Sequence, residues 1–305
     1  MTTVGISFPH DALMASGPEQ RRQLLRLSAD AGLDHITVGD HISFHGGTGF
    51  DGLVSATSVL ATQDDLSVIV GVYLLGLRHP MVAARQLVTV SQMAPGRLVL
   101  GVGVGGEDRS EISNSGVNPA TRGRQLDEAL GLVRRLVTGE EVTHRGEFFA
   151  LDRAQVLPPL AEPIPLVVGG KGTAAVSRTA AHGDGWLGIF CSARRFAQTR
   201  SEILDAAVAL GRPEPSWFGV NVWCGLDADE ATARRLIGVQ MENLYKLPYE
   251  KFQHLAPAGN PESVAEWLRD FVGGGAEHVT LIPVAASLEA GIKQVARVRQ
   301  ILLGR

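Results

Sequence analysis

The stretch HITVGDHISFH, residues 35–45, begins as a strand and ends as a polar loop. Its first four residues are mostly β-branched and apolar, which is typical of a buried strand. The charged pair Asp40-His41 follows almost at once, and the strand character stops there. Parallel α/β folds bind their ligands at the carboxyl ends of their strands. This stretch therefore predicts a buried parallel strand whose end faces a ligand site.

Seven further runs have the same apolar character, and amphipathic helical stretches separate them. Runs that are apolar almost throughout are typical of strands covered on both faces. Eight alternating strand and helix units predict an α/β fold, a (β/α)8 TIM barrel. A doubly wound sheet is the competing layout and typically needs fewer strands. The expected strands lie near residues 3–9, 35–41, 66–75, 97–106, 164–170, 185–190, 217–226 and 278–284.

The expected helices carry recognisable start signals and apolar faces. Gln20–Ala31 and Thr121–Val137 have apolar residues at helical spacing. Pro80 and the pair Asn260-Pro261 are placed to begin two further helices, because proline fits the first helical turn.

Two stretches interrupt the alternation of strands and helices. Residues 141–163 predict a hairpin that turns at Arg145-Gly146, followed by a proline-rich connection. Residues 239–260 are expected to be irregular. We expect both to be insertions into a single domain that spans residues 1–305.

The composition favours a cytoplasmic globular protein. The chain has 28 basic and 32 acidic residues and no block of like charge, so nothing indicates nucleic acid or an acidic membrane as a partner. Its first residues lack a signal-peptide pattern, and no window holds roughly 18 apolar residues in a row. Cys191 and Cys224 are too few for a disulfide framework, and we expect reduced core residues.

Polar and glycine-rich segments gather at the expected strand ends, where barrel enzymes have their active sites. A histidine beside a carboxylate that can raise its pKa favours a functional role for His41 over a purely structural one. The segments are Asp40-His41, Tyr73-Leu74, the loop GVGVGGED (101–108) and GGKGT (169–173).

Two of these segments resemble phosphate-binding loops. Gly101, Gly103 and Gly106 match G-x-G-x-x-G, but the following EDRSEISNSG is expected to be a loop, and Asp127 falls inside a helix. The dinucleotide fingerprint therefore fails its context. The glycines of GGKGT instead open directly into a helix, whose N-terminal amides can hold a phosphate. An ordinary tight turn is the alternative for GGKGT.

Metal and serine-hydrolase chemistry have little support. His41 and His45 are four residues apart, but that spacing needs a helix to form a metal site, and this segment leaves a strand. No Gly-x-Ser-x-Gly elbow is present. We expect no metal site, and a metal-dependent barrel hydrolase is disfavoured.

In their order and spacing, these segments resemble the bacterial luciferase-like flavin and deazaflavin oxidoreductases. The resemblance covers nearly the whole chain. It implies a TIM barrel with insertions, usually a homodimer, with the flavin-type ring in the barrel mouth. The segments that carry it are GDHI, GVYLLGLRHP, GRLVLGVGVGGEDRSEISNSGV and PIPLVVGGKGTAAVSRTAAHGDGW.

The resemblance also implies roles for residues. His41 and Asp40 would be catalytic, and Asp40 would also contact the cofactor. A non-proline cis peptide is implied at Tyr73–Leu74, against the ring. Glu107 would be a second proton donor or acceptor, although an extra glycine leaves the register of this acid open between Gly106 and Glu107. Cofactor contacts are implied at Asp40, Tyr73, Leu74, Gly103, Val104, Gly105, Gly106, Gly169, Gly170, Lys171, Gly172 and Thr173.

We therefore expect a coenzyme F420-dependent oxidoreductase that transfers a hydride between the deazaflavin and a small organic substrate. His41, tuned by Asp40, would donate or accept the accompanying proton. An FMN-dependent luciferase-like monooxygenase is the alternative within this class. A flavin-binding or deazaflavin-binding protein without turnover is the alternative from another class.

Overall fold

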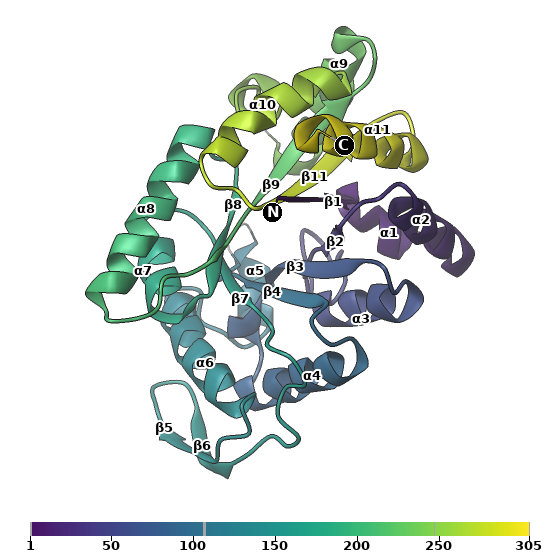
Figure 1. The fold of residues 1–305 in the computed structure, drawn as a ribbon. Helices are drawn as coiled ribbons and strands as arrows, with labels where there is room; N and C mark the ends of the chain where they lie inside the picture. The colour runs from purple at the N-terminus through teal and green to yellow at the C-terminus, as the bar shows by residue number, and fades with distance from the viewer. Residues whose placement is uncertain (1, 106–107, 247, 305) are drawn as a thin grey trace.

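Eight parallel strands pair edge to edge and close into a barrel in the computed structural model, which describes residues 2–105, 108–246 and 248–304 (Figure 1). The order around the barrel is β9-β11-β1-β2-β3-β4-β7-β8, and pairing of β8 with β9 closes the ring. The predicted (β/α)8 barrel is confirmed, and the alternative of an open doubly wound sheet is wrong. The barrel strands are β1 (Thr3–Ser7), β2 (His35–Val38), β3 (Ser67–Tyr73), β4 (Leu98–Val102), β7 (Leu166–Gly169), β8 (Gly185–Ile189), β9 (Trp217–Leu226) and β11 (His278–Val284).

Helices surround the barrel and bury their apolar faces against the strands (Figure 1). Proline occupies the first turn of α4 and of α10, as the sequence predicts, and the Asn260 side chain accepts a hydrogen bond from the Ser263 amide. The longer helices are α2 (Pro18–Asp30), α3 (Gly52–Thr62), α4 (Pro80–Met93), α6 (Arg122–Leu136), α7 (Gly172–His182), α8 (Ala193–Ala209), α9 (Glu230–Tyr245), α10 (Pro261–Gly273) and α11 (Leu288–Leu303).

None of the helices within the described ranges is long and apolar enough to cross a membrane. Cys191 and Cys224 are both free thiols, and Cys224 is fully buried. The short elements are η1 (Pro9–Asp11), α1 (Ala12–Ala15), η2 (Leu75–Leu77), α5 (Arg109–Asn114), η3 (Tyr249–Lys251) and β10 (Ala258–Gly259).

The two interruptions of the alternation differ in how well the sequence predicted them. The hairpin is confirmed as the antiparallel pair β5 (Val142–Arg145) and β6 (Ala150–Ala154), at the edge of the barrel (Figure 1). The second stretch is not irregular from its start, because α9 continues to Tyr245. Ile237 and Met241, four residues apart, bury one face of α9 in a cluster with Trp223.

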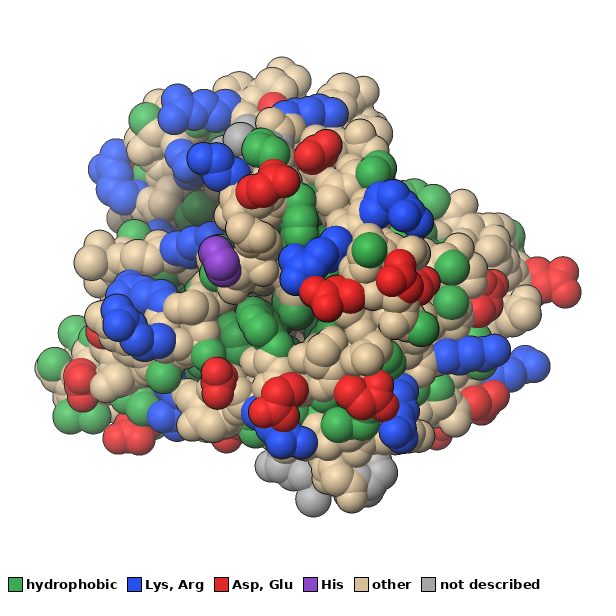
Figure 2. Space-filling model, turned by 90° about the horizontal axis from the view of Figure 1, so that it is seen from above, with side chains coloured by type: hydrophobic (Ala, Val, Ile, Leu, Met, Phe, Trp, Pro, Cys, Tyr) green, Lys and Arg blue, Asp and Glu red, His purple; other side chains and the backbone are tan. Residues whose placement is uncertain are grey.

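Charged side chains of both signs are interspersed on the outer surface, as Figure 2 shows for one face of the molecule. This distribution fits a chain whose net charge is only -4. Salt bridges between exposed residues, such as Arg234 with Glu230 in α9, contribute little stability. The stability of the fold therefore comes mainly from the apolar packing between barrel and helices.

A small polar network lies inside the barrel near the beginnings of its strands. The His35 Nε2 and Thr280 Oγ1 atoms are 2.9 Å apart, and Thr280 Oγ1 is also 2.9 Å from Thr37 Oγ1. His278 Nδ1 lies 2.9 Å from Thr3 Oγ1. Gly5 lets His35 pass close to β1, because a Cβ on Gly5 would lie 2.2 Å from the His35 carbonyl oxygen.

Burial keeps both histidines of this network neutral. Desolvation, followed by the charge of His278, lowers the pKa of His35 from 6.5 to about 3. Desolvation lowers the pKa of His278 from 6.5 to about 4. Below pH 6.5 the unfolded chain therefore binds protons that the folded chain does not bind until about pH 4. Stability present above pH 6.5 is lost as the pH falls through this window.

We expect the free energy of unfolding to fall between pH 7 and pH 5. The buried neutral His35 should account for about 2 kcal/mol of this loss. Urea denaturation of the wild type and of His35→Gln at both pH values measures this. The variant should show the smaller pH dependence, whatever its stability at pH 7. The exposed His254, changed to Gln, serves as the control and should keep the wild-type dependence. Equal pH dependence in wild type and His35→Gln would contradict the assignment.

Candidate functional site

A cavity of about 940 Å³ lies at the carboxyl ends of the barrel strands. Gly71 of β3 and Asn221 of β9 contribute to its inner end. His41 and Phe44, from the loop after β2, line its wall, and so does Trp223 of β9. The cavity is within the range of about 300–1,000 Å³ that is typical of small-molecule sites. Its position at the strand ends is where barrel enzymes place their active sites.

His41 is the predicted catalytic residue that the structure places in this cavity. Its side chain is 33 % exposed, and its Nδ1 lies 3.2 Å from Oε2 of Glu111. The imidazole stacks on Phe44 with ring centroids 4.2 Å apart, and Phe44 contacts the ring of His45 at 4.0 Å. The imidazole is therefore held on one side by a carboxylate and on one face by an aromatic ring.

Glu111 is a site residue that the sequence reasoning missed. Its carboxylate is 3 % exposed, and Oε1 accepts hydrogen bonds from the backbone amides of Ile42 and Ser43. One carboxylate thus fixes both the loop after β2 and the His41 ring. Two backbone amides therefore hold this buried carboxylate in place beside the imidazole.

Glu111 lies on α5, in a segment that we expected to be a loop, and that expectation is wrong. The Asp108 carboxylate caps α5 by accepting hydrogen bonds from the Ser110 hydroxyl and amide. Hydrogen bonds from Ser110, and then from the amide of His45, lower the pKa of Asp108 to about 2. The pattern Asp108-x-x-Glu111 is a helix-start signature that could have revealed the helix.

Asp40 does not line the cavity, and its position differs from the one that the sequence suggested. It is 2 % exposed and accepts hydrogen bonds from the amides of Gly52 and Leu74. Both terminal nitrogens of Arg78 also bind it, at 2.7 and 2.8 Å. Its oxygens are therefore directed away from His41, and the carboxylate that contacts the imidazole is that of Glu111.

The end of β3 also differs in detail. The non-proline cis peptide is present, but it joins Gly71 to Val72 rather than Tyr73 to Leu74. Tyr73 is fully buried, with its hydroxyl 3.4 Å from Gln86, and burial raises its pKa. Leu74 donates its amide to Asp40. Gly71, not Tyr73 or Leu74, is the residue of this segment that lines the cavity.

Val72 brings together the predicted glycine segments. A Cβ on Gly103 would lie 2.4 Å from the Val72 side chain, and a Cβ on Gly169 would lie 2.7 Å from it. The two strand ends can therefore pack around Val72 only because glycine occupies these positions. Val104 is partly buried, and Gly105 has a φ of 65°. The predicted residues Gly106 and Glu107 lie outside the described residues.

Gly170, Lys171, Gly172 and Thr173 form the exposed start of α7. Lys171 is the N-cap residue, and its side chain makes no capping hydrogen bond. The Gly170 carbonyl accepts a hydrogen bond from the Trp186 indole at 3.0 Å, which anchors the turn to β8. The N–H groups in the first turn of a helix have no acceptor within the helix, so this end of α7 suits an anionic group.

Asn221 is a second residue that the sequence reasoning did not single out. Its side chain is 6 % exposed within a strand that is buried along its whole length. Its Oδ1 has no hydrogen-bond partner among the described residues. A buried amide oxygen at the inner end of a cavity is suited to a ligand donor. The signal was present, because Asn221 is a lone amide in the apolar run WFGVNVWCGL.

Among the residues that the structure describes, no three His, Cys, Asp or Glu side chains are grouped so that they could hold a metal ion.

Comparisons with known proteins give the family and the fold. The family model described as "Luciferase-like monooxygenase" matches residues 2–278. An F420-dependent glucose-6-phosphate dehydrogenase of Nakamurella multipartita is 31% identical over 194 residues, which are 61% of this chain and 57% of that protein. The matched region thus covers little more than half of this relative.

Two solved structures superimpose on almost the entire chain. An F420-dependent secondary alcohol dehydrogenase in complex with an F420-acetone adduct has a TM-score of 0.85 at 18% identity and covers 99% of both chains. The monooxygenase RslO1 from Streptomyces bottropensis has a TM-score of 0.83 at 20% identity, with the same coverage. At these identities the likeness shows the shared barrel fold.

We expect Asp40→Asn to lower the free energy of unfolding by about 3 kcal/mol, because it leaves Arg78 with an incomplete buried partner. Asp51→Asn is the matched control, since Asp51 pairs with the same Arg78 but is 38 % exposed, and asparagine still caps a helix. It should cost less than about 1 kcal/mol. Urea denaturation measures both, and equal losses would contradict the assignment.

Proposed function

Because the chain belongs to the luciferase-like monooxygenase family, we propose that it is an oxidoreductase that uses coenzyme F420 to move a hydride to or from a small organic substrate. The observation that carries this proposal is the His41 imidazole, held by Glu111 at the wall of the 940 Å³ cavity. A positioned imidazole is the commonest proton donor or acceptor in enzymes. The F420-dependent dehydrogenase among the relatives supports the choice of cofactor.

The cavity fits a flavin-type ring on two observations. The unpartnered Asn221 Oδ1 can accept a hydrogen bond from a ring N–H or hydroxyl. The backbone at Gly71, which carries no side chain, lets a planar ring approach β3 closely. When bound, the deazaflavin supplies the hydride chemistry. Asn221 and the Gly71 backbone would orient the ring, and Trp223 and Ile282 would exclude water.

His41 would hold or transfer the proton that accompanies the hydride step. The Glu111 carboxylate at Nδ1 fixes the orientation of the ring, so Nε2 is the atom available for exchange with a ligand. Glu111 is in this account a positioning residue, and Asp40 supports the loop from outside the cavity. Glu107 stays a secondary candidate for proton transfer.

The start of α7 would hold the phosphate of the cofactor. The Lys171 ammonium and the first-turn amides of Gly172 and Thr173 offer a cation and oriented N–H groups on one exposed helix end. Val104 and the glycines Gly103, Gly105 and Gly169 would form the rim of the cofactor site around Val72.

Three finer features belong to the same proposal. We propose that the protein acts as a homodimer, as the resemblance to its family implies, and in the cytoplasm, as its composition favours. FMN is the alternative cofactor and monooxygenation the alternative reaction, which the likeness to a monooxygenase structure supports. A protein that binds a flavin or deazaflavin without turnover is the alternative outside catalysis.

Equilibrium titration of the purified protein with coenzyme F420 and, separately, with FMN tests the cofactor. We expect coenzyme F420 to bind at least tenfold more tightly, a difference of about 1.4 kcal/mol. Lys171→Ala should weaken binding of F420, because it removes a cation from the phosphate end. Tighter binding of FMN would move the function to flavin-dependent oxygenation, and binding of neither would overturn the proposal.

His41→Ala should lower kcat by about 10²- to 10⁴-fold, because general acid–base catalysis is lost. The assay follows oxidation or reduction of coenzyme F420 with the best substrate from a panel of secondary alcohols and activated alkenes. The Kd for the cofactor, measured on the same variant, should change less than kcat. His254→Ala, an exposed histidine outside the cavity wall, is the control. An unchanged kcat in His41→Ala would exclude the proposed role.

A further inference from the structure

The loop between β2 and α3, residues 39–51, forms one wall of the cavity at the barrel mouth and is termed here the mouth loop. Phe44, His45 and Phe50 are among the residues through which it lines the cavity. All of its residues are described, and they form no helix or strand apart from an isolated bridge between Phe44 and Thr48. The shape of this wall therefore depends on side chains that hold the loop from other elements.

Asp108, the N-cap residue of α5, is one of these side chains, and it uses its two carboxylate oxygens for two tasks. Oδ1 accepts hydrogen bonds from the amide and the hydroxyl of Ser110, at 2.9 and 2.5 Å, and so caps α5. Oδ2 accepts a hydrogen bond from the amide of His45, at 2.9 Å. One side chain thus begins the helix that carries Glu111 and also holds the mouth loop.

The hydrogen bond to His45 acts on the catalytic imidazole through Phe44. The Phe44 ring lies 4.0 Å from the His45 ring and 4.2 Å from the His41 ring, measured between centroids. The His41 ring is thus packed against Phe44 while its Nδ1 lies 3.2 Å from Glu111. If His45 were released, Phe44 would lose its support, and the imidazole could turn away from Glu111.

We propose that Asp108 is a positioning residue for His41. By holding the His45 amide, it keeps Phe44 against the imidazole and Nε2 directed to the ligand. The inference rests on the function proposed above, in which Nε2 exchanges a proton with the ligand. Asp108 itself is outside the cavity lining, so its effect on turnover passes through the mouth loop. Its side chain is only 12 % exposed, so water cannot readily replace it as the acceptor.

Asp108→Asn separates the two tasks of this side chain. Asparagine caps a helix about as well as aspartate, so α5 and Glu111 should keep their place. The asparagine side chain has only one acceptor oxygen, and while that oxygen caps α5, its NH2 group faces the His45 amide, donor against donor. We expect kcat with coenzyme F420 to fall about tenfold to a hundredfold, as small misplacements of catalytic groups do. The Kd for the cofactor should change less than kcat.

Asp229→Asn is the matched control for the capping task. Asp229 is the N-cap residue of α9, and its Oδ2 accepts hydrogen bonds from the amide and the hydroxyl of Thr232, at 2.9 and 2.7 Å. These contacts repeat those that Asp108 makes with Ser110, but they do not involve the mouth loop. The substitution should therefore leave kcat unchanged.

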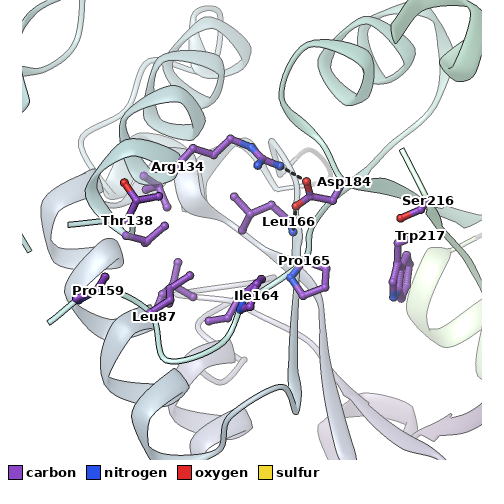
Figure 3. Close-up of a pocket in the computed structure, with 14 residues that line it drawn as sticks. Leu87, Arg134, Thr138, Pro159, Ile164, Pro165, Leu166, Asp184, Ser216 and Trp217 are labelled. Carbon is purple, nitrogen blue, oxygen red and sulfur yellow. Dashed lines mark hydrogen bonds and ion pairs between the residues drawn. The ribbon is translucent and has the colours of Figure 1, made fainter. Parts of the chain in front are cut away.

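Asp184→Asn is the control for the loss of a carboxylate that holds a backbone amide. Asp184 lines a cavity of about 550 Å³ at the opposite end of the barrel, where β7 and β9 begin (Figure 3). Its Oδ2 accepts a hydrogen bond from the Leu166 amide at 2.8 Å, and its Oδ1 pairs with Arg134 at 2.7 Å. This variant should lose stability without losing kcat, because the packed interior of the barrel separates it from His41.

Amide hydrogen exchange, followed by mass spectrometry on the protein without added cofactor, tests the tether apart from activity. The amides of residues 41–45 are all hydrogen bonded in the mouth loop. In Asp108→Asn, peptides that cover these residues should exchange at least threefold faster than in the wild type. Peptides from α6 should exchange at the wild-type rate, and both controls should keep the wild-type rate in the mouth loop.

The outcomes separate this inference from the proposed function. If the wild type turns over coenzyme F420 and Asp108→Asn keeps full kcat, the inference is overturned and the proposed function stands. If the wild type does not turn over, the proposed function fails, and equal exchange rates in wild type and Asp108→Asn would overturn the tether as well. An equal loss of kcat in either control would also refute the inference. If Asp108→Asn does not fold, Asp108→Ser, which caps a helix with one short acceptor, is judged by the same criteria.

Discussion

The Asp40 carboxylate accepts hydrogen bonds from the backbone amides of Gly52 and Leu74 and from both terminal nitrogens of Arg78. These donors belong to the start of α3, the segment after β3 and the segment before α4. One buried charge thus joins the ends of two neighbouring strands to two helices. A buried carboxylate must have such donors to be tolerated. The shape of the barrel mouth at this point therefore depends on Asp40.

This constraint explains why the pair Asp40-His41 does not act as a pair. Successive residues of an extended chain point to opposite sides. The Asp40 side chain binds Arg78 outside the cavity, whereas the His41 side chain lines the cavity, where its imidazole needs a partner from another element. Glu111, seventy residues further along the chain, supplies that partner at 3.2 Å. Asp40 thus fixes the backbone beside His41, and Glu111 fixes the His41 imidazole.

The features that could be predicted from the sequence are those with local causes. The eight strands follow from β-branched apolar runs, and the start of α10 follows from Asn260-Pro261. The contact between His41 and Glu111 has no local signal, because it is made by tertiary packing. The cis bond at Gly71–Val72 was misplaced by two residues, since the strand β3 is irregular between Val70 and Tyr73. Asn221 could have been singled out as a lone amide in an apolar strand, and α5 by its capping pattern.

The filled barrel gives its two ends independent chemistry. At the mouth, loops carry His41 and Phe44 to a cavity with an unpartnered amide oxygen at its inner end. At the other end, helices and a proline-rich connection enclose an apolar cavity with a guanidinium at its edge. Trp217 closes the second end, and layers of side chains separate it from the first. Substitutions at one end should therefore add to those at the other, because residues that share no partner and lie far apart couple weakly.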